Sequence, residues 1–358
     1  MRSVFTVLLA LVLLSPMRSF ALDQELRDLY TGARAQAMGN AFTAVADDEQ
    51  ALFYNPAGLA GNKKVSIHYL TLDTELSGDA FGTYTGNPGA FSNPSISTIN
   101  SVIGTDVYAR AMVTPTILLP NMAFALIADE QIAILSANQA LPQITLGLQT
   151  TTGIQAGYGF SFSPGRLKMD EIRVGFGGKL LWRRGGYHDL NVTSLISLSQ
   201  NELNSLTGSY GTGYGFDAGM QYIHTFSPSF SAMAGLASEQ IGGVTFSEST
   251  ADPQPNDTSA GLAVKYKMAL TSVLLAYDYR NITQTADAAL KQHFGIEVKV
   301  PFISIEGGLS QGYPTYGTSF DLWLFRVSAL VYQQEQDAIQ GQSPERRYRL
   351  RLDMKFDL

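Results

Sequence analysis

The 358-residue sequence contains no cysteine, which excludes disulfide bridges, thiolate metal ligands, a cysteine nucleophile and a lipid attached to an N-terminal cysteine. Charged residues make up only 15% of the chain, against about 25% in ordinary soluble domains, so a water-exposed surface would be unusually poor in charge. The net charge of −7 argues against a nucleic-acid partner, because phosphate contacts need clustered lysine and arginine. With 45% hydrophobic residues, the chain is nevertheless too apolar for intrinsic disorder.

No internal segment is long and apolar enough to be a transmembrane helix, and the best one, 117–128, is interrupted by Pro120-Asn121. Residues 1–21 have a positive Arg2, an apolar core over 4–14 and the small-x-small triplet Ser19-Phe20-Ala21. This pattern is typical of a cleaved secretory signal peptide, and its core is too short for the alternative of a membrane anchor. We therefore expect an exported protein, either soluble and secreted or an outer-membrane barrel.

Alternation of apolar and polar residues is common to these two classes and recurs along the chain. Over 347–358 every second residue is apolar and every other one is charged, and similar alternation recurs at 154–162, 172–183, 214–222, 262–267 and 294–300. Such a period of two predicts β-strands with one apolar and one polar face. Alternation alone does not show which face points inward. The low charge and the 17 tyrosines favour a barrel whose apolar faces meet lipid.

The connections between the predicted strands support a barrel. Strands are predicted near 64–73, 121–136, 143–150, 153–162, 171–183, 213–226, 230–240, 258–267, 270–280, 292–300, 302–311, 316–325, 327–335 and 346–358, which makes fourteen. Short periplasmic turns alternate with long external loops, expected at 74–120, 184–212, 241–257, 281–291 and 336–345; only 151–152 and 163–170 depart from this rule. We predict an all-β fold over 63–358, an antiparallel up-and-down transmembrane barrel of about 14 strands in the outer membrane of a Gram-negative bacterium, with membrane lipid around it.

The segment 22–62 has no alternation and is rich in small residues, so we expect it to form a hatch that fills the barrel lumen. Residues 32–61, GARAQAMGNAFTAVADDEQALFYNPAGLAG, resemble the N-terminal hatch of the FadL-like outer-membrane transporters, and more closely that of their PorV-like relatives. The resemblance implies a fourteen-strand barrel, a luminal hatch and passage of hydrophobic molecules. It also implies that Asn55, Pro56 and Ala57 form a hatch turn near the ligand path, and that Arg34, Asp47 and Asp48 are hatch charges facing the wall. The chain is shorter than the better-known transporters and ends in Leu358 where the family usually has phenylalanine.

Several charged residues fall on the predicted inner faces: Arg173, Lys179, Asp217, Lys265, Glu297, Glu306, Arg349 and Arg351. One interpretation is an ion-selective pore. The other is pairing with each other and with the hatch charges, which the high cost of an unpaired buried charge favours.

Catalytic and metal-binding patterns are absent from the sequence. The acidic pair Asp47-Asp48 has no histidine at a useful spacing, and the four histidines lie far apart without an i, i+4 partner. No Gly-x-Ser-x-Gly or Ser–His–Asp signature occurs, so a hydrolase has no supporting constellation. We therefore predict a protein that is not an enzyme and has no cofactor and no metal site.

Two external segments are rich in apolar residues, 96–119 and 192–206. In the second, Val192, Leu195, Ile196, Leu203 and Leu206 fall at helical spacing. They predict either a capture site for a lipid-like molecule or a helix packed on the barrel rim. The leading functional hypothesis is a passive channel for hydrophobic small molecules, such as long-chain fatty acids, gated by the hatch. The alternative is a PorV-like barrel whose partners are exported proteins.

Overall fold

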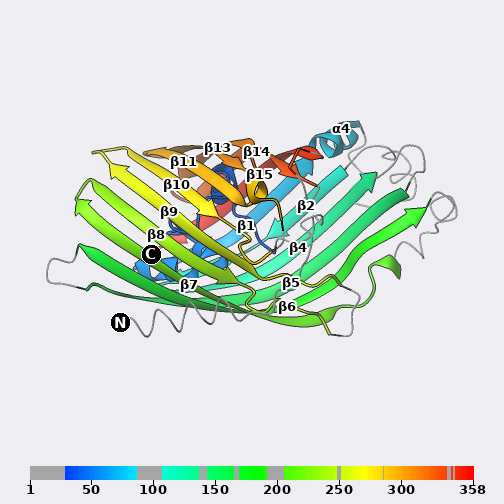
Figure 1. The fold of residues 1–358 in the computed structure, drawn as a ribbon, viewed down its shortest axis with the longest axis horizontal. Coiled ribbons are helices and arrows are strands. Elements are labelled where there is room, and N and C mark those ends of the chain that lie inside the picture. The colour runs from blue at the N-terminus through cyan, green and yellow to red at the C-terminus, as the bar shows by residue number, and fades with distance from the viewer. Residues whose placement is uncertain are drawn as a thin grey trace.

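The computed structural model describes residues 29–86, 107–136, 143–164, 169–191, 205–247, 251–284, 286–336, 340–341 and 343–358. The predicted signal peptide, 1–21, lies outside the described residues. The rest is dominated by a single antiparallel sheet that closes on itself, because the last strand pairs with the first (Figure 1). Among the described residues, no helix is both long and apolar enough to cross a membrane.

The strands follow one another around the barrel in sequence order. They are β1 (Ser66–Ser77), β2 (Val107–Val113), β3 (Thr116–Leu119), β4 (Met122–Ser136), β5 (Gln143–Phe162), β6 (Asp170–Asn191), β7 (Gly211–Ser227), β8 (Phe230–Glu239), β9 (Asp257–Lys267), β10 (Ser272–Tyr279), β11 (Gln292–Val300), β12 (Ile303–Ser310), β13 (Tyr313–Leu322), β14 (Phe325–Glu335) and β15 (Pro344–Asp357). Both β2 and β3 lie between β1 and β4, so the fifteen segments fill fourteen positions in the wall.

The predicted number of strands is correct, but two of the predicted strands are wrong. The predicted turn at 151–152 does not exist, since β5 runs unbroken through it; a run of threonines there hides the alternation without bending the backbone. The predicted loop 74–120 contains β2 and β3. The inner face of β2 carries large side chains such as Tyr108 and Arg110, and its outer face carries the small Ala109 and Ala111, so its alternation is hard to recognise. The two errors cancel in the count.

The outer face of the barrel is apolar and the inner face is polar. Side chains such as Leu262, Phe294 and Ile296 are exposed on the outside, whereas Lys179 and Glu297 are buried on the inside. A soluble β-protein would bury the apolar set instead. Closure satisfies the backbone hydrogen bonds without water, as lipid requires. The predicted transmembrane barrel is therefore confirmed.

The described N-terminal residues lie in the barrel lumen (Figure 1). They contain α2 (Ala33–Ala37), α3 (Ala51–Tyr54) and the 3-10 helix η2 (Pro56–Gly61), and we call residues 29–61 the plug. Two further short helices, α4 (Gly78–Gly86) and η3 (Ala288–Lys291), belong to loops between strands.

Glycine on the wall lets the plug backbone approach closely. A Cβ atom added to Gly175 of β6 would lie 2.2 Å from the carbonyl carbon of Pro56. No real side chain fits such a gap, so the close contact between η2 and β6 depends on glycine at this position.

Replacement of Gly175 by alanine should push η2 away from the wall and destabilise the barrel by about 1–3 kcal/mol, the usual cost of overpacking. Gly178→Ala is the matched control, because a Cβ at Gly178 on the outer face meets nothing within 4 Å. Thermal unfolding in detergent micelles and protease cleavage within the plug would measure the difference. Equal behaviour of the two variants would contradict the proposed close packing.

Candidate functional site: the plug and the barrel wall

Arg34 of α2 connects the plug to itself and to the wall. Its Nη1 donates to Asp47 Oδ1 at 2.6 Å and to Asp48 Oδ2 at 2.9 Å, while its Nη2 donates to Glu297 Oε2 of β11 at 2.6 Å. Burial lowers the pKa of Arg34, but the carboxylates of Asp47, Glu297 and Asp48 raise it well above its usual value. Arg34 therefore remains charged and holds the loop that carries the two aspartates against β11.

Glu49 makes a second connection between the plug and the wall, to β14 and β15. Its Oε1 accepts from Arg326 Nη1 at 3.2 Å and from Arg351 Nη2 at 3.0 Å, and Arg351 also donates to the Tyr30 hydroxyl at 2.7 Å. Burial raises the pKa of Glu49, but Arg326, His68 and Arg351 outweigh it and hold this pKa below its usual value. The pair of arginines thus keeps Glu49 ionised inside the barrel.

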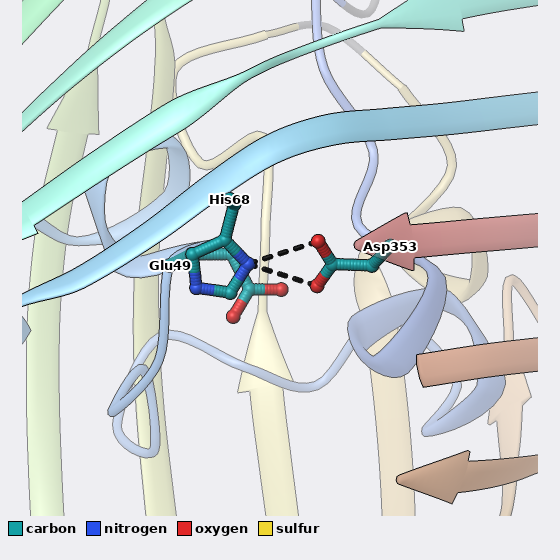
Figure 2. A group of neighbouring side chains, drawn as sticks. All are labelled: Glu49, His68 and Asp353. Atoms are coloured by element: carbon teal, nitrogen blue, oxygen red, sulfur yellow. Dashed lines mark hydrogen bonds and ion pairs between the residues drawn. The ribbon is translucent and has the colours of Figure 1, made fainter. Parts of the chain in front are cut away.

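Glu49, His68 and Asp353 form a buried group whose possible ligand atoms all lie within 4.8 Å of one another (Figure 2). His68 Nδ1 lies 2.9 Å from both Asp353 oxygens. Oxygen and imidazole ligands of this kind suit a divalent metal. However, Glu49 already pairs with two arginines, and Arg326 also lies 4.0 Å from Asp353. These positive charges neutralise the carboxylates, so the group fits an ion-pair network better than a cation site.

Side-chain hydrogen bonds hold the plug backbone in place. Asp278 Oδ2 of β10 accepts from the amides of Phe42 and Thr43 and from the Thr43 hydroxyl, each at 2.7 Å. Asn55 donates to the Thr43 carbonyl at 2.8 Å and accepts from the Ala57 amide at 3.1 Å. The predicted hatch turn of Asn55, Pro56 and Ala57 is buried at the start of η2, against β6 and β7.

All eight predicted lumen charges lie on the inner face. Lys179 pairs with Asp217 at 2.9 Å and Lys265 approaches Asp47 at 3.5 Å. The other contacts are Arg34–Glu297, Glu49–Arg351, Asp73–Arg349 at 2.6 Å and Glu171–Arg173 at 2.8 Å, while Glu306 accepts from Ser304 and Ser319. This arrangement is the pairing that the cost of buried charge favours.

Sequence reasoning missed several of the residues that hold the plug. Glu49 directly follows the predicted Asp47-Asp48 pair, and Asp278 is a single charge between Tyr277 and Tyr279 on an alternating strand. Both acidic residues could therefore have been singled out from the sequence. Nothing in the sequence, however, indicates that Glu49 meets Arg326 and Arg351, which are about 300 positions away along the chain.

The outer face of the wall carries an apolar groove of about 740 Å³ over β1 and β3–β6. Its exposed lining includes Ile117, Phe124, Leu126 and Ile154. Barrel walls are normally convex on the outside, so this groove marks an indentation. It lies where β2 ends and β3 begins, at Thr114-Pro115.

The pairing between strands is irregular beside this groove. Pro115 has no amide hydrogen, and β1 carries one extra residue, Tyr69, relative to its neighbours. The wall nevertheless stays closed, because the Thr114 amide donates to the Thr71 carbonyl and the Leu126 amide to the Pro115 carbonyl, both at 3.0 Å. We call this stretch of the β1–β2/β3 boundary the seam.

A second apolar surface lies near the long-loop end of the same strands. Its residues are on the sheet face opposite to the inward-pointing Tyr108: Leu76, Val107, Ile132, Ile134, Leu146, Leu148 and Leu190. Ala80 of α4 and Leu206 pack on it. Leu206 is the one predicted capture residue that the structure describes, whereas Val192, Leu195, Ile196 and Leu203 lie outside the described residues. We call this surface the external apolar cluster.

Neither a family model nor a curated protein matches the chain. Among solved structures, it is similar to the monoaromatic hydrocarbon channel CymD, with a TM-score of 0.46 and 9% identity over 92% of this chain and 98% of that one. It is similar to the toluene transporter TbuX of Ralstonia pickettii, with a TM-score of 0.45 and 11% identity over 92% and 98% of the two chains. For the toluene transporter TodX of Pseudomonas putida, the TM-score is 0.44 and the identity 10%, over 94% and 99%. Similarity at this level does not carry a substrate over to this chain.

Glu49→Gln should lower the free energy of unfolding at neutral pH by about 3 kcal/mol, because two arginines lose their buried partner. The folded-state pKa of Glu49 lies below its unfolded value, so the stability from this carboxylate is complete above about pH 4.3 and is lost as the pH falls below it. At pH 3 the difference between wild type and variant should be smaller by about 1.5–2 kcal/mol. Thermal unfolding in detergent micelles at several pH values would measure this, and a difference independent of pH would refute the assignment.

Proposed function

We propose that the protein is an outer-membrane channel for hydrophobic small molecules, and that these molecules cross the barrel wall at the seam. The observation that carries the proposal is the apolar groove on the outer face beside Pro115. A concave apolar surface of this size suits a small apolar molecule. It lies beside an irregular strand pairing, so the binding surface adjoins a place where the wall needs few changes to open.

The lumen itself does not suit an apolar solute. The plug occupies it, and the described space between plug and wall is lined largely by charged and amide side chains. An apolar molecule moving along the axis would have to displace buried ion pairs such as Arg34–Glu297, which is costly. The route along the wall avoids this cost.

The external apolar cluster provides the outer part of this route. It lies on β1, β2 and β4–β6, and all of these strands except β2 also line the groove. A solute captured under α4 and the segment around Leu206 would move along an apolar face toward the seam. In this proposal the plug closes the lumen behind the seam, and its rearrangement controls passage inward.

A long-chain fatty acid as the solute stays a prediction, as does gating by the hatch. No contact among the described residues favours the alternative of an exported-protein partner. Recovery of lipid or hydrocarbon from the purified barrel would support the channel over that alternative.

A disulfide across the seam should block transport. The double variant Ile67→Cys with Ile117→Cys places two thiols on directly paired residues of β1 and β3, and the natural chain has no cysteine to interfere. Uptake of an apolar fluorescent probe by proteoliposomes should fall to the level of protein-free vesicles when the disulfide is oxidised. A reducing agent should restore it.

Leu275→Cys with Ile296→Cys is the matched control, because these residues pair in the same way between β10 and β11, far from the seam. Oxidation of this variant should leave uptake unchanged. Unchanged uptake with an oxidised seam disulfide would show that solutes do not leave through this part of the wall.

A further inference from the structure

Three neighbouring hairpin turns at the short-turn end carry apolar residues at their tips. They join β9 to β10, β11 to β12 and β13 to β14, and their tips contain Met268-Ala269-Leu270, Pro301-Phe302 and Trp323-Leu324. Trp323 is 82% exposed, Leu270 is 75% exposed and Phe302 is 66% exposed. Short turns of outer-membrane barrels face the periplasm, where polar tips would be expected.

The two aromatic residues of these tips also occupy unfavourable backbone conformations. Phe302 has φ +69° and Trp323 has φ +42°, in the left-handed region that favours glycine or asparagine. The turn between β3 and β4 has Asn121 in this region, with φ +63°. Large exposed side chains kept at strained positions indicate a role other than folding.

Other described turns of this rim have less apolar tips. The turn between β7 and β8 has Pro228-Ser229 at its tip, with the exposed Phe226 and Phe230 on the flanking strand ends, and the start of β1 follows the exposed Lys64. Among the described turns of this rim, apolar residues at the tips themselves are concentrated on one side of the barrel, β9–β14, where the strands are also shorter than β4–β7.

We propose that the apolar tips of the β9–β14 hairpins insert into the periplasmic leaflet of the membrane, at the boundary between headgroups and acyl chains. The tips continue the lipid-facing outer surface, since Phe320, Leu322 and Ile303 on the adjoining strand ends are exposed on that face. They carry no charge that would select a protein partner. Tryptophan and other aromatic side chains prefer this boundary because it accommodates both an apolar ring and a polar edge.

Insertion also places a polar vestibule beside the lipid. A cavity of about 200 Å³ lies between the plug and β9–β15; it is lined by the Arg34 ion-pair group and bordered by Phe302 and Ile303. The charged underside of the plug would then open at the lipid headgroups rather than into the bulk periplasm. This inference does not depend on which solute the channel carries.

The two tryptophans of the chain, Trp182 and Trp323, permit a direct test. In Trp182→Phe, assembled into phosphatidylcholine nanodiscs, Trp323 is the only tryptophan. Its emission should be blue-shifted, quenched by lipids brominated near the headgroup end of the acyl chain, and poorly quenched by aqueous acrylamide. Trp323→Phe is the reference, because it leaves only Trp182 on the lipid-facing side of β6.

Emission typical of tryptophan in water, with full access to acrylamide, would overturn the proposal; so would protection that appears only after a second protein is added. A further variant, Trp323→Asn, removes the strain together with the ring. It should fold in detergent at least as well as wild type but show a lower folded fraction in vesicles. An equal folded fraction in vesicles would also count against insertion.

Discussion

The structure depends on the pairing of charges that the surrounding lipid forces into the barrel. The outer face must be apolar and the backbone must close, so the charged residues of the strands gather inside. An unpaired charge there would cost several kcal/mol or more. The plug supplies many of the missing partners, since Arg34 neutralises Glu297 and Glu49 lies between Arg326 and Arg351. Plug and wall therefore form one electrostatic unit.

This pairing also restricts where a solute can move. Because ion pairs and amide side chains line the described lumen, the apolar surfaces of the chain are on the outside, in the groove beside Pro115 and in the external apolar cluster. The groove coincides with a proline that lacks an amide hydrogen and with an extra residue in β1. In the proposed route, solutes cross the wall at this irregular pairing, and the plug closes the lumen behind it.

The barrel is also asymmetric around its circumference. The long strands β4–β7 form one side, and the shorter strands β9–β14 form the other (Figure 1). The groove involves long strands, and the apolar hairpin tips belong to the short ones. On the first side, we propose that solutes cross the wall. On the second side, we propose that the hairpin tips enter the periplasmic leaflet. Both features concern the boundary with lipid, where a protein that handles apolar molecules would meet them.

The barrel was predictable from the chain, because alternation such as that of residues 347–358 reports which side chains share a face of a strand, and the low charge favours apolar faces that meet lipid. The inward placement of charges such as Lys179 and Arg349 was predictable too, since a charge on the lipid face would be costly. The continuity of β5, the place of β2 and β3 in the wall and the contact of Glu49 with two arginines of distant strands became visible only in the folded chain. Local pattern carries no information about partners that are brought together by closure of the sheet, so neither the ion-pair network nor the groove at the seam was evident in the chain.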